Sequence, residues 1–485
     1  MEVKELNPEI VWKNFYELTR IPRPSKKESK AVEYLYNFGK SLGLETYKDE
    51  IGNIIIRKPA TPGMEGKKGV ILQGHIDMVP QKNADKVHDF EKDPIEAWVD
   101  GEWVKAKGTT LGADNGLGVA ASLAVLESKE LKHGPIEVLV TVDEETGMTG
   151  ARELKSGVLK GDILINLDSE TEGELYIGCA GGLDVTAVRD YSLQTVPAGY
   201  KAFTLNVKGF KGGHSGMDIV LYRANANKIA SRILLPLIRD FGVKLVSIDG
   251  GSLRNAIPRE AFAQILVPEN KVQDTEKLVA EIQAAVMAEY SVADPEGKIF
   301  LEPLADLPSE CIDDKDALSA IRAVNACPNG VWRMSDEMPG LVETSNNMAI
   351  VKTENSKFYV KTLLRSSVDT SKDAMAEEVR SVFELAGFSV ELTGGYSGWA
   401  PNSSSPILHT MRKVYEDLYG KQPAIMAIHA GLECGILGGT YPNWDMVSCG
   451  PTIMSPHSPD ERTNIASVER WWNFLVATLE RIPEK

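Results

Sequence analysis

Cysteine is scarce in this chain of 485 residues, which contains only five. They are odd in number, widely spaced and never arranged as Cys-x-x-Cys; they are Cys179, Cys311, Cys327, Cys434 and Cys449. Such spacing does not build a disulfide framework. It predicts reduced, mostly buried thiols and therefore a cytoplasmic protein.

Basic residues and long hydrophobic runs are also lacking. The chain has 53 Lys+Arg against 69 Asp+Glu, a formal net charge of −16. Because a sequence-independent nucleic-acid binder needs a basic face, this balance argues against a nucleic-acid partner. No apolar run approaches the ~18–20 residues of a membrane helix, and residues 1–5 lack the charged-then-apolar pattern expected of a signal peptide. We therefore expect no nucleic acid and no membrane as partners.

What remains is an ordinary globular composition, 43% hydrophobic and 25% charged. Short apolar runs predict four strands, and helical spacing predicts a helix between the second and third. The strands cover residues 53–56, 69–73, 136–142 and 163–167, and the helix covers residues 117–126. Runs that are apolar on both faces suit strands buried between helical layers. We expect an α/β fold with a mixed, largely parallel sheet flanked by helices.

The character of the chain changes near residue 185. Strand–helix–strand patterns with glycine-rich turns then continue to about residue 398, and they include helices predicted over residues 272–290 and 374–386. Residues 399–485 return to apolar helix patterns. This order predicts a discontinuous first domain, residues 1–185 and 399–485, with an α+β domain of residues 186–398 inserted into it.

A local signal near the N-terminus concerns a helix start. Ser25 and Glu28 have the three-residue spacing of a capping box, in which each side chain bonds the backbone N–H of the other. The pattern predicts that a second helix opens here, after a first helix that follows Pro8.

Histidine and acidic residues gather where the predicted strands end. They are His75 with Asp77, Asp114, Glu144 with Glu145, and Asp168. In open α/β sheets, ligand crevices form at the carboxyl ends of the strands. Nitrogen and oxygen ligands of this kind suit divalent metals, zinc above all where histidine is present. The four clusters together predict a metal site.

Each cluster also has an ordinary structural explanation. Asp114 stands where a helix cap often stands, and Asp168 suits a turn. Their occurrence in order at equivalent edges favours the metal site. His75 and Asp77 share a face in an extended strand, so Asp77 can orient the imidazole. The adjacent Glu144 and Glu145 point apart, which suits one as ligand and the other as proton carrier.

The ordered motifs resemble those of the co-catalytic zinc peptidases, the family that includes carnosinase, aminoacylase and glutamate carboxypeptidases. Within it the resemblance is strongest to the bacterial aminoacyl-histidine (Xaa-His) dipeptidases, and it covers essentially the whole chain. The motifs are Gly74-His75-Ile76-Asp77, Gly112-Ala113-Asp114-Asn115-Gly116, Asp143-Glu144-Glu145-Thr146-Gly147, Asn166-Leu167-Asp168-Ser169-Glu170, Gly212-Gly213-His214-Ser215-Gly216, Asn255-Ala256-Ile257-Pro258 and Ser455-Pro456-His457-Ser458.

The resemblance implies two Zn²⁺ ions per subunit, with Co²⁺ or Mn²⁺ as substitutes. Asp114 would bridge the two ions and would precede a cis peptide bond to Asn115. The remaining metal ligands would be His75 and Asp168 for one ion, and Glu145 and His457 for the other. The catalytic residues would be Asp77, which orients His75, and Glu144, the general base.

The resemblance also bears on the substrate. Aspartate at the position of Asp168 is typical of the family's aminopeptidases and dipeptidases, whereas acylases and carboxypeptidases have glutamate there. It therefore favours a metallo-dipeptidase acting on small peptides, including carnosine-like Xaa-His substrates. The alternatives are an N-acyl amino acid deacylase or a tripeptide aminopeptidase of the same fold. A metal-binding protein without catalysis is a further alternative, but it would need neither Asp77 nor Glu144.

The resemblance implies that the inserted domain is a lid and favours a homodimer formed through it. His214 and Asn255 match lid residues that reach the substrate. Either Arg365 or Lys361 would bind the substrate carboxylate, since a guanidinium can hold a carboxylate through two hydrogen bonds. Glu433 is either the group that holds the substrate amino group or a structural carboxylate.

Overall fold

The computed structural model describes residues 2–485 and divides into two compact units. The first unit comprises Met1–Gly178, Pro401–Ala427 and Leu432–Lys485, and the second comprises Cys179–Ala400 and Ile428–Gly431. The chain thus leaves the first unit and returns to it. Domain boundaries at residues 185 and 398 remain a prediction from the sequence. The short return of residues 428–431 to the second unit has no counterpart in that prediction.

The first unit is built on a mixed eight-stranded sheet in the order β1-β2-β6-β3-β7-β23-β8-β22. The strands are β1 Glu45–Lys48, β2 Ile54–Lys58, β3 Val70–His75, β6 Ile136–Thr141, β7 Ile163–Asn166, β8 Glu174–Cys179, β22 Ala424–Ile428 and β23 Asp445–Ser448. The central strands β6, β3, β7 and β23 run parallel, and β1, β2 and β8 pair antiparallel. The predicted fold class is confirmed.

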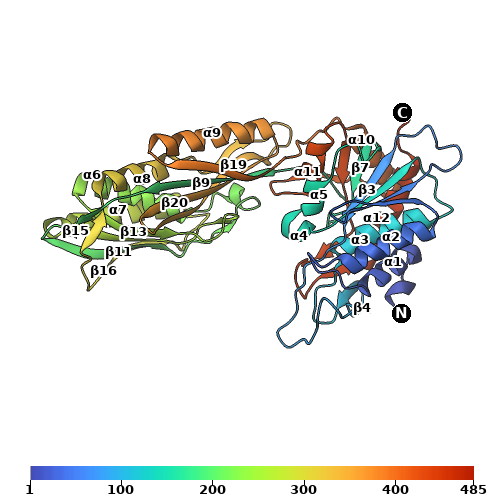
Figure 1. Cartoon of the computed structure of the whole chain (residues 1–485), viewed down its shortest axis with the longest axis horizontal. Coiled ribbons are helices and arrows are strands. Elements are labelled where there is room, and N and C mark those ends of the chain that lie inside the picture. The colour runs from blue at the N-terminus through green and yellow to red at the C-terminus, as the bar shows by residue number, and fades with distance from the viewer. Residues whose placement is uncertain (1) are drawn as a thin grey trace. The chain divides into compact units, whose positions relative to one another are not determined.

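Helices flank this sheet (Figure 1). They are η1 Val3–Glu5, α1 Glu9–Thr19, α2 Ser29–Ser41, α3 Ala113–Glu127, α4 Glu144–Gly147, α5 Thr149–Glu153, α10 Pro406–Tyr419, α11 Glu433–Thr440 and α12 Ile465–Glu480. Helix α3 is apolar on every side, as a helix enclosed by protein must be, and it packs against α1 and β3. No described helix has both the length and the apolar character needed to span a bilayer.

Two glycines let α3 approach the sheet closely. A Cβ atom on Gly118 would stand 2.5 Å from the carbonyl oxygen of Leu167, and one on Gly74 would overlap the Asn115 side chain. Asn115 uses this proximity, because its amide donates to Leu167 O (2.6 Å) and accepts from His75 N (3.2 Å). The start of α3 is therefore joined to the ends of β3 and β7.

A small antiparallel sheet, in the order β24-β25-β5-β4, completes the first unit. Its strands are β4 Ala97–Asp100, β5 Trp103–Ala106, β24 Ile453–Met454 and β25 Arg462–Asn464. The loop between β24 and β25 carries His457. Pairing of β25 with β5 anchors one end of that loop.

The second unit contains a nine-stranded antiparallel sheet in the order β16-β11-β15-β13-β19-β20-β9-β21, with β18 also paired to β19. The strands are β9 Gly181–Asp190, β11 Tyr200–Lys208, β13 Lys244–Gly250, β15 Ala261–Pro268, β16 Lys298–Pro303, β18 Gly330–Met334, β19 Val342–Glu354, β20 Lys357–Ser366 and β21 Ser389–Tyr396. Two short pairs are β10 Leu193–Thr195 with β17 Glu310–Ile312, and β12 Gly213–His214 with β14 Ala256–Ile257.

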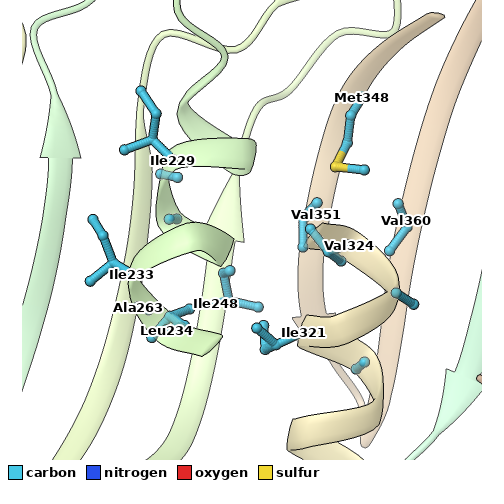
Figure 2. Close-up of a cluster of buried hydrophobic side chains, with 14 of the residues drawn as sticks. Ile229, Ile233, Leu234, Ile248, Ala263, Ile321, Val324, Met348, Val351 and Val360 are labelled. Carbon is cyan, nitrogen blue, oxygen red and sulfur yellow. The ribbon is translucent and has the colours of Figure 1, made fainter. Parts of the chain in front are cut away.

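The helices of the second unit are η2 Ile219–Leu221, α6 Ala226–Phe241, η3 Glu269–Lys271, α7 Val272–Glu289, α8 Asp314–Ala326 and α9 Asp369–Leu385. One buried cluster contains Ile229 and Ile233 of α6, Ile321 of α8, and Val351 and Val360 of the strands (Figure 2). The predicted inserted α+β architecture therefore has its own core.

The predicted capping box is wrong. Helix α2 begins at Ser29, and its N-cap residue Glu28 makes no side-chain cap bond. The Ser25 hydroxyl donates to Asp77 Oδ2 (2.8 Å), and Glu28 Oε1 accepts from the backbone N–H groups of Lys26 and Asp143. Both side chains serve tertiary contacts with neighbouring loops, which outweigh the local helix signal.

Candidate metal centre

The parallel strands of the first unit bring the predicted ligands to one edge of the sheet. His75 is the last residue of β3, Glu144 and Glu145 open α4 directly after β6, and Asp168 follows β7. Because β3 is parallel to both β6 and β7, these strand ends lie side by side. Asp114 stands in the first turn of α3, and the peptide bond to Asn115 is cis, as the resemblance implies.

Asp114 faces two groups of ligands with its two oxygens. Its Oδ1 lies 3.2 Å from His75 Nε2, which is itself 3.3 Å from Asp168 Oδ1. Its Oδ2 lies 3.1 Å from His457 Nε2, which is 3.0 Å from Glu145 Oε2. We call these the His75 half-site and the His457 half-site. The carboxylate of Asp114 is shared between them.

The spacing of these atoms fits divalent cations. Ligands placed tetrahedrally at 2.0–2.1 Å from a zinc ion are about 3.3 Å from one another, close to the separations in both half-sites. One ligand atom each of His75, Asp114 and Glu145 all lie within 4.8 Å of one another. Nitrogen and carboxylate oxygen donors without thiolate suit Zn²⁺, Co²⁺ and Mn²⁺. The residues present therefore fit a two-metal centre.

The electrostatics of the centre also call for cations. Burial, the largest effect, raises the pKa of Asp168 to about 7 even though His75 lowers it. Burial likewise raises the pKa of Glu144 well above its ordinary value. For His75, burial lowers the pKa, but Asp168, Asp114 and the other carboxylates outweigh it and raise the pKa well above the ordinary value. This excess of buried carboxylate is what a bound dication neutralises.

Asp77 orients His75 from behind. His75 Nδ1 lies 3.1 Å from the backbone carbonyl oxygen of Asp77 and 3.3 Å from Asp77 Oδ1, so the Nδ1 proton faces Asp77 and Nε2 faces the half-site. Asp77 also accepts the backbone N–H groups of Glu144 (3.0 Å) and Glu145 (3.2 Å) and the hydroxyl of Ser25. Burial raises its pKa, but these donors outweigh it and lower the pKa to about 2. Asp77 is therefore a carboxylate that fixes two ligand segments at once.

Glu144 lies beside the His75 half-site. Its Oε2 is 4.0 Å from His75 Nε2, outside the shortest ligand separations. The turn that presents it is fixed by Asp143, which adopts a left-handed conformation at φ 53° and accepts hydrogen bonds from the hydroxyls of Thr146 and Thr149. A carboxylate in this position can exchange a proton with a group held at the centre.

Glu433, at the start of α11, is a buried carboxylate of the first unit. Its Oε2 accepts from Gln73 Nε2 (2.6 Å) and Thr141 Oγ1 (2.7 Å). Its Oε1 has no hydrogen-bond partner among the described residues. Burial raises the pKa of Glu433 to about 7, and His75 and Asp168 are near enough to affect it. An unpartnered buried oxygen is costly unless a ligand satisfies it.

The second unit gathers the other predicted residues. His214 Nδ1 accepts the backbone N–H groups of Gly216 (3.2 Å) and Met217 (3.1 Å), which leaves the proton of a neutral imidazole on Nε2. Arg365 is 5% exposed, and its Nε donates to Ser215 Oγ (3.3 Å). Asn255 is exposed, and its carbonyl accepts from Ser215 N (2.8 Å). Arg365 and His214 therefore belong to one cluster.

Sequence reasoning missed His429 as a member of this cluster. Its Nε2 lies 2.7 Å from Ser345 Oγ. A Cβ on Gly216 would overlap the carbonyl of His429 and stand 3.1 Å from His214 Cε1 and 3.2 Å from Arg365 Nε. His429 lies in none of the recognised motifs, so no spacing could have pointed to it. Arg23 and Glu461, which are buried beside the Asp114 loop, were also missed.

Comparison with known proteins identifies the family. Residues 71–481 match the sequence profile of the peptidase family M20/M25/M40. The chain belongs to this family. Together with the ligand set around Asp114, this makes it a metallopeptidase.

Two relatives match the chain over essentially its full length. The chain is 47% identical over 490 residues to the cytosol non-specific dipeptidase of Escherichia coli strain K12, covering 100% of both. The crystal structure of aminoacylhistidine dipeptidase from Vibrio alginolyticus matches with a TM-score of 0.96 and 50% identity, covering 100% of this chain and 99% of that one. Aminopeptidase PepT from Bacillus cereus matches at a TM-score of 0.58 and 16% identity over 98% and 99% of the two chains, which shows a shared fold alone.

Proposed function

We propose that this metallopeptidase is a dipeptidase that hydrolyses unblocked dipeptides, including Xaa-His substrates. The observation that carries the proposal is Asp114, whose two oxygens each face a histidine–carboxylate pair. The relatives named above, one called a non-specific dipeptidase and one an aminoacylhistidine dipeptidase, support the substrate class. The Asp at position 168 is in keeping with a dipeptidase.

Two zinc ions per subunit are assigned to the two half-sites. His75 and Asp168 would hold one ion, Glu145 and His457 the other, and Asp114 would bridge them. Bound divalent metal supplies Lewis-acid polarisation of the scissile carbonyl and lowers the pKa of a water molecule. Co²⁺ or Mn²⁺ would fit the same donors.

Glu144 is assigned as general base and then general acid. At 4.0 Å from His75 Nε2 it is near the centre without sharing the closest ligand contacts. It would take a proton from the attacking water and pass it to the leaving nitrogen, a transfer that contributes about 10²–10⁴-fold to rate. Asp77 acts on His75, since it holds the Nδ1 proton and so keeps Nε2 directed at the half-site.

The two ends of a dipeptide are assigned to opposite charges. Glu433 would hold the substrate ammonium through its unpartnered Oε1. Arg365 would hold the substrate carboxylate. Lys361 lies on the same face of β20, but it is four residues, or about 13 Å, from Arg365 and its cluster. Arg365 is therefore the better assignment.

His214 is assigned to the oxyanion that forms when the carbonyl is attacked. Its Nδ1 is occupied by two backbone N–H groups, so Nε2–H is the group free to donate. Asn255 is proposed as a further polar contact to the substrate.

The experiment that tests the proposal is a substrate panel. Ala-His, β-Ala-His, Ala-Ala, a tripeptide and N-acetyl amino acids would be assayed with metal, after chelation and after metal is added back. The dipeptides should be cleaved in a metal-dependent way, and the N-acetyl compounds should not, because they lack the ammonium that Glu433 would hold. Preference for N-acetyl substrates would support a deacylase, and preference for the tripeptide would support a tripeptide aminopeptidase.

We also propose a cytoplasmic location and a homodimer formed through the second unit. The relative from Escherichia coli is described as cytosolic, and all five cysteines are buried. The nine-stranded sheet ends in strands β16 and β21, which could pair with another copy. Sedimentation equilibrium would distinguish a dimer from a monomer.

A further inference from the structure

Two buried charged side chains, Glu461 and Arg23, bind the backbone of the loop that carries Asp114. Glu461 accepts from its N–H groups, and Arg23 donates to one of its carbonyl groups. Glu461 accepts the backbone N–H groups of four successive residues: Leu111 at 2.7 Å, Gly112 at 2.9 Å, Ala113 at 2.8 Å and Asp114 at 3.2 Å. Oε2 takes the first two and Oε1 the last two. Glu461 is only 2% exposed, so these bonds do not compete with water.

Arg23 donates a hydrogen bond to a backbone carbonyl of the same loop. Its NH2 group donates to Gly112 O (2.6 Å), and its NH1 group donates to Ile76 O (2.8 Å) and Asp77 O (3.3 Å). Arg23 is also 2% exposed. The loop backbone thus lies between a guanidinium and a carboxylate.

The fit around the guanidinium is tight. Gly112 has φ +70°, a conformation that side chains rarely adopt, and a Cβ there would stand 2.6 Å from an Arg23 nitrogen and 2.9 Å from Met78 Sδ. A Cβ on Gly116 would also stand 2.6 Å from Arg23. The glycines of the Gly112–Gly116 motif therefore leave room for this one side chain.

The two contacts connect three ligand-bearing segments. Arg23 joins the segment of His75 and Asp77 to the Asp114 loop. Glu461 stands four residues after His457 in the loop between β24 and β25, so it joins the segment of His457 to the Asp114 loop. The single histidine-bearing segment of each half-site is thus fixed to the loop of the shared aspartate.

We propose that Arg23 and Glu461 are positioning residues that set the separation of the two metal half-sites, with Glu461 governing the His457 half-site. The inference rests on the proposed two-metal function. The His457 side chain is half-exposed, so without Glu461 only a surface loop would hold it. Residues that contact metal ligands from outside the ligand set typically change metal affinity by about 10–100-fold.

The test is metal release from Glu461→Gln. A glutamine at this position keeps the size of the side chain but turns an NH₂ group towards two of the four N–H donors. We expect the purified variant to lose one of two Co²⁺ or Zn²⁺ ions to a chelator at least tenfold faster than the wild type. The other ion should leave at nearly the wild-type rate. Glu461→Asp, which keeps the charge, should release this ion at a rate between those of the wild type and Glu461→Gln.

A matched control is Glu137→Gln. Glu137 is another buried carboxylate of the first unit that accepts two backbone N–H groups, from Lys160 (2.7 Å) and Gly161 (2.8 Å), at the opposite end of β6. The Glu137→Gln variant should have a lower melting temperature than the wild type but the same rate of metal release. If Glu137→Gln releases metal as fast as Glu461→Gln, the effect is general destabilisation and the inference fails.

The result also separates this inference from the proposed function. Wild-type protein that binds no divalent metal would overturn the proposed function. Wild-type protein with two ions, and Glu461→Gln with the same two ions and the same release rates, would overturn only the role of Glu461. Kinetics provide a second readout, because a positioning role should lower kcat while KM for Ala-His stays within a few-fold.

Discussion

Single side chains at the candidate metal centre are proposed to act in two ways. Asp114, His75 and His457 present atoms to the half-sites, whereas Asp77 and Glu461 hold the segments on which those atoms stand. The distinction is one of contact: the first group faces the centre and the second faces backbone N–H groups or a ring nitrogen. Substitutions in the two groups should therefore have different signatures.

Replacement of Glu144 tests the proton-transfer role. Glu144→Ala should keep both metal ions, because its Oε2 lies farther from His75 Nε2 than the oxygens of Asp114 and Asp168 do. Turnover of Ala-His should fall by about 10²–10⁴-fold, the contribution of a general base. Metal analysis and steady-state kinetics on the same sample are needed. A variant with near wild-type turnover would rule out the assignment.

His429 should make stability depend on pH. Burial, followed by the nearby Arg365, lowers its pKa from 6.5 to about 3. Between these values the unfolded chain binds a proton that the folded chain does not, so stability is full above pH 6.5 and falls as the pH drops through this window. The slope is at most about 1.4 kcal/mol per pH unit.

Chemical unfolding of the second unit at pH 7.5 and pH 5.0 measures this effect. His429→Gln should lose less stability between the two pH values than the wild type does. His409→Gln, at an exposed position in α10 of the first unit, is the control and should leave the unfolding of the second unit as it is in the wild type. Equal pH dependence in all three proteins would contradict the assignment to His429.

At the scale of elements, the apolar runs in the sequence predict the buried strands and helix of the first unit correctly. The strands predicted over residues 53–56, 69–73, 136–142 and 163–167 correspond to β2, β3, β6 and β7, and the predicted helix lies within α3. Burial on both faces leaves such segments few alternatives. Parallel pairing of the strands then brings their ends together, which is why the ligand cluster could be anticipated.

The sequence does not predict the role of side chains whose hydrogen-bond partners are distant in the chain. Ser25 and Glu28 have the spacing of a capping box, but their side chains bind Asp77 and the backbone of Asp143. Arg23 and Glu461 left no signal at all, because they bind backbone groups, and a bond to backbone imposes no residue type on the partner. His429 depends on a return of the chain that periodicity does not reveal.

The close packing of α3 gives a prediction for the element as a whole. Gly118→Ala would place a Cβ 2.5 Å from Leu167 O, so either α3 or the end of β7 must move. Overpacking of this kind costs about 1–3 kcal/mol. Gly66→Ala is the control, since its Cβ would meet nothing closer than 3.5 Å. Urea unfolding of the first unit should separate the two variants.

Because Leu167 precedes Asp168, the same variant should also weaken metal binding at the His75 half-site. The movement would disturb the Asn115 hydrogen bonds that join α3 to β3 and β7. Destabilisation of Gly118→Ala no greater than that of Gly66→Ala would show that α3 has more room than the geometry indicates.

At the scale of the whole molecule, all the proposed metal ligands belong to the first unit. A ligand that binds only the folded state stabilises it by about 2.7 kcal/mol at a concentration 100 times Kd. Chelation should therefore lower the melting temperature of the first unit and leave that of the second unchanged. Differential scanning calorimetry with and without chelator would show this as one shifted and one unshifted transition. A single transition that shifts as a whole would mean that the two units unfold together.

Strand β23 gives the order of synthesis a particular importance. It lies between β7 and β8 in the sheet, although residues 179–400 of the second unit separate it from both strands in the sequence. During translation β7 and β8 emerge early, yet the strand that joins them, and His457 after it, come only after the second unit has been made. The nascent chain must carry an incomplete sheet with an exposed gap through most of its synthesis. It can acquire neither its full core nor its second half-site until that late segment is inserted, so this gap is where chaperones have the most time to act.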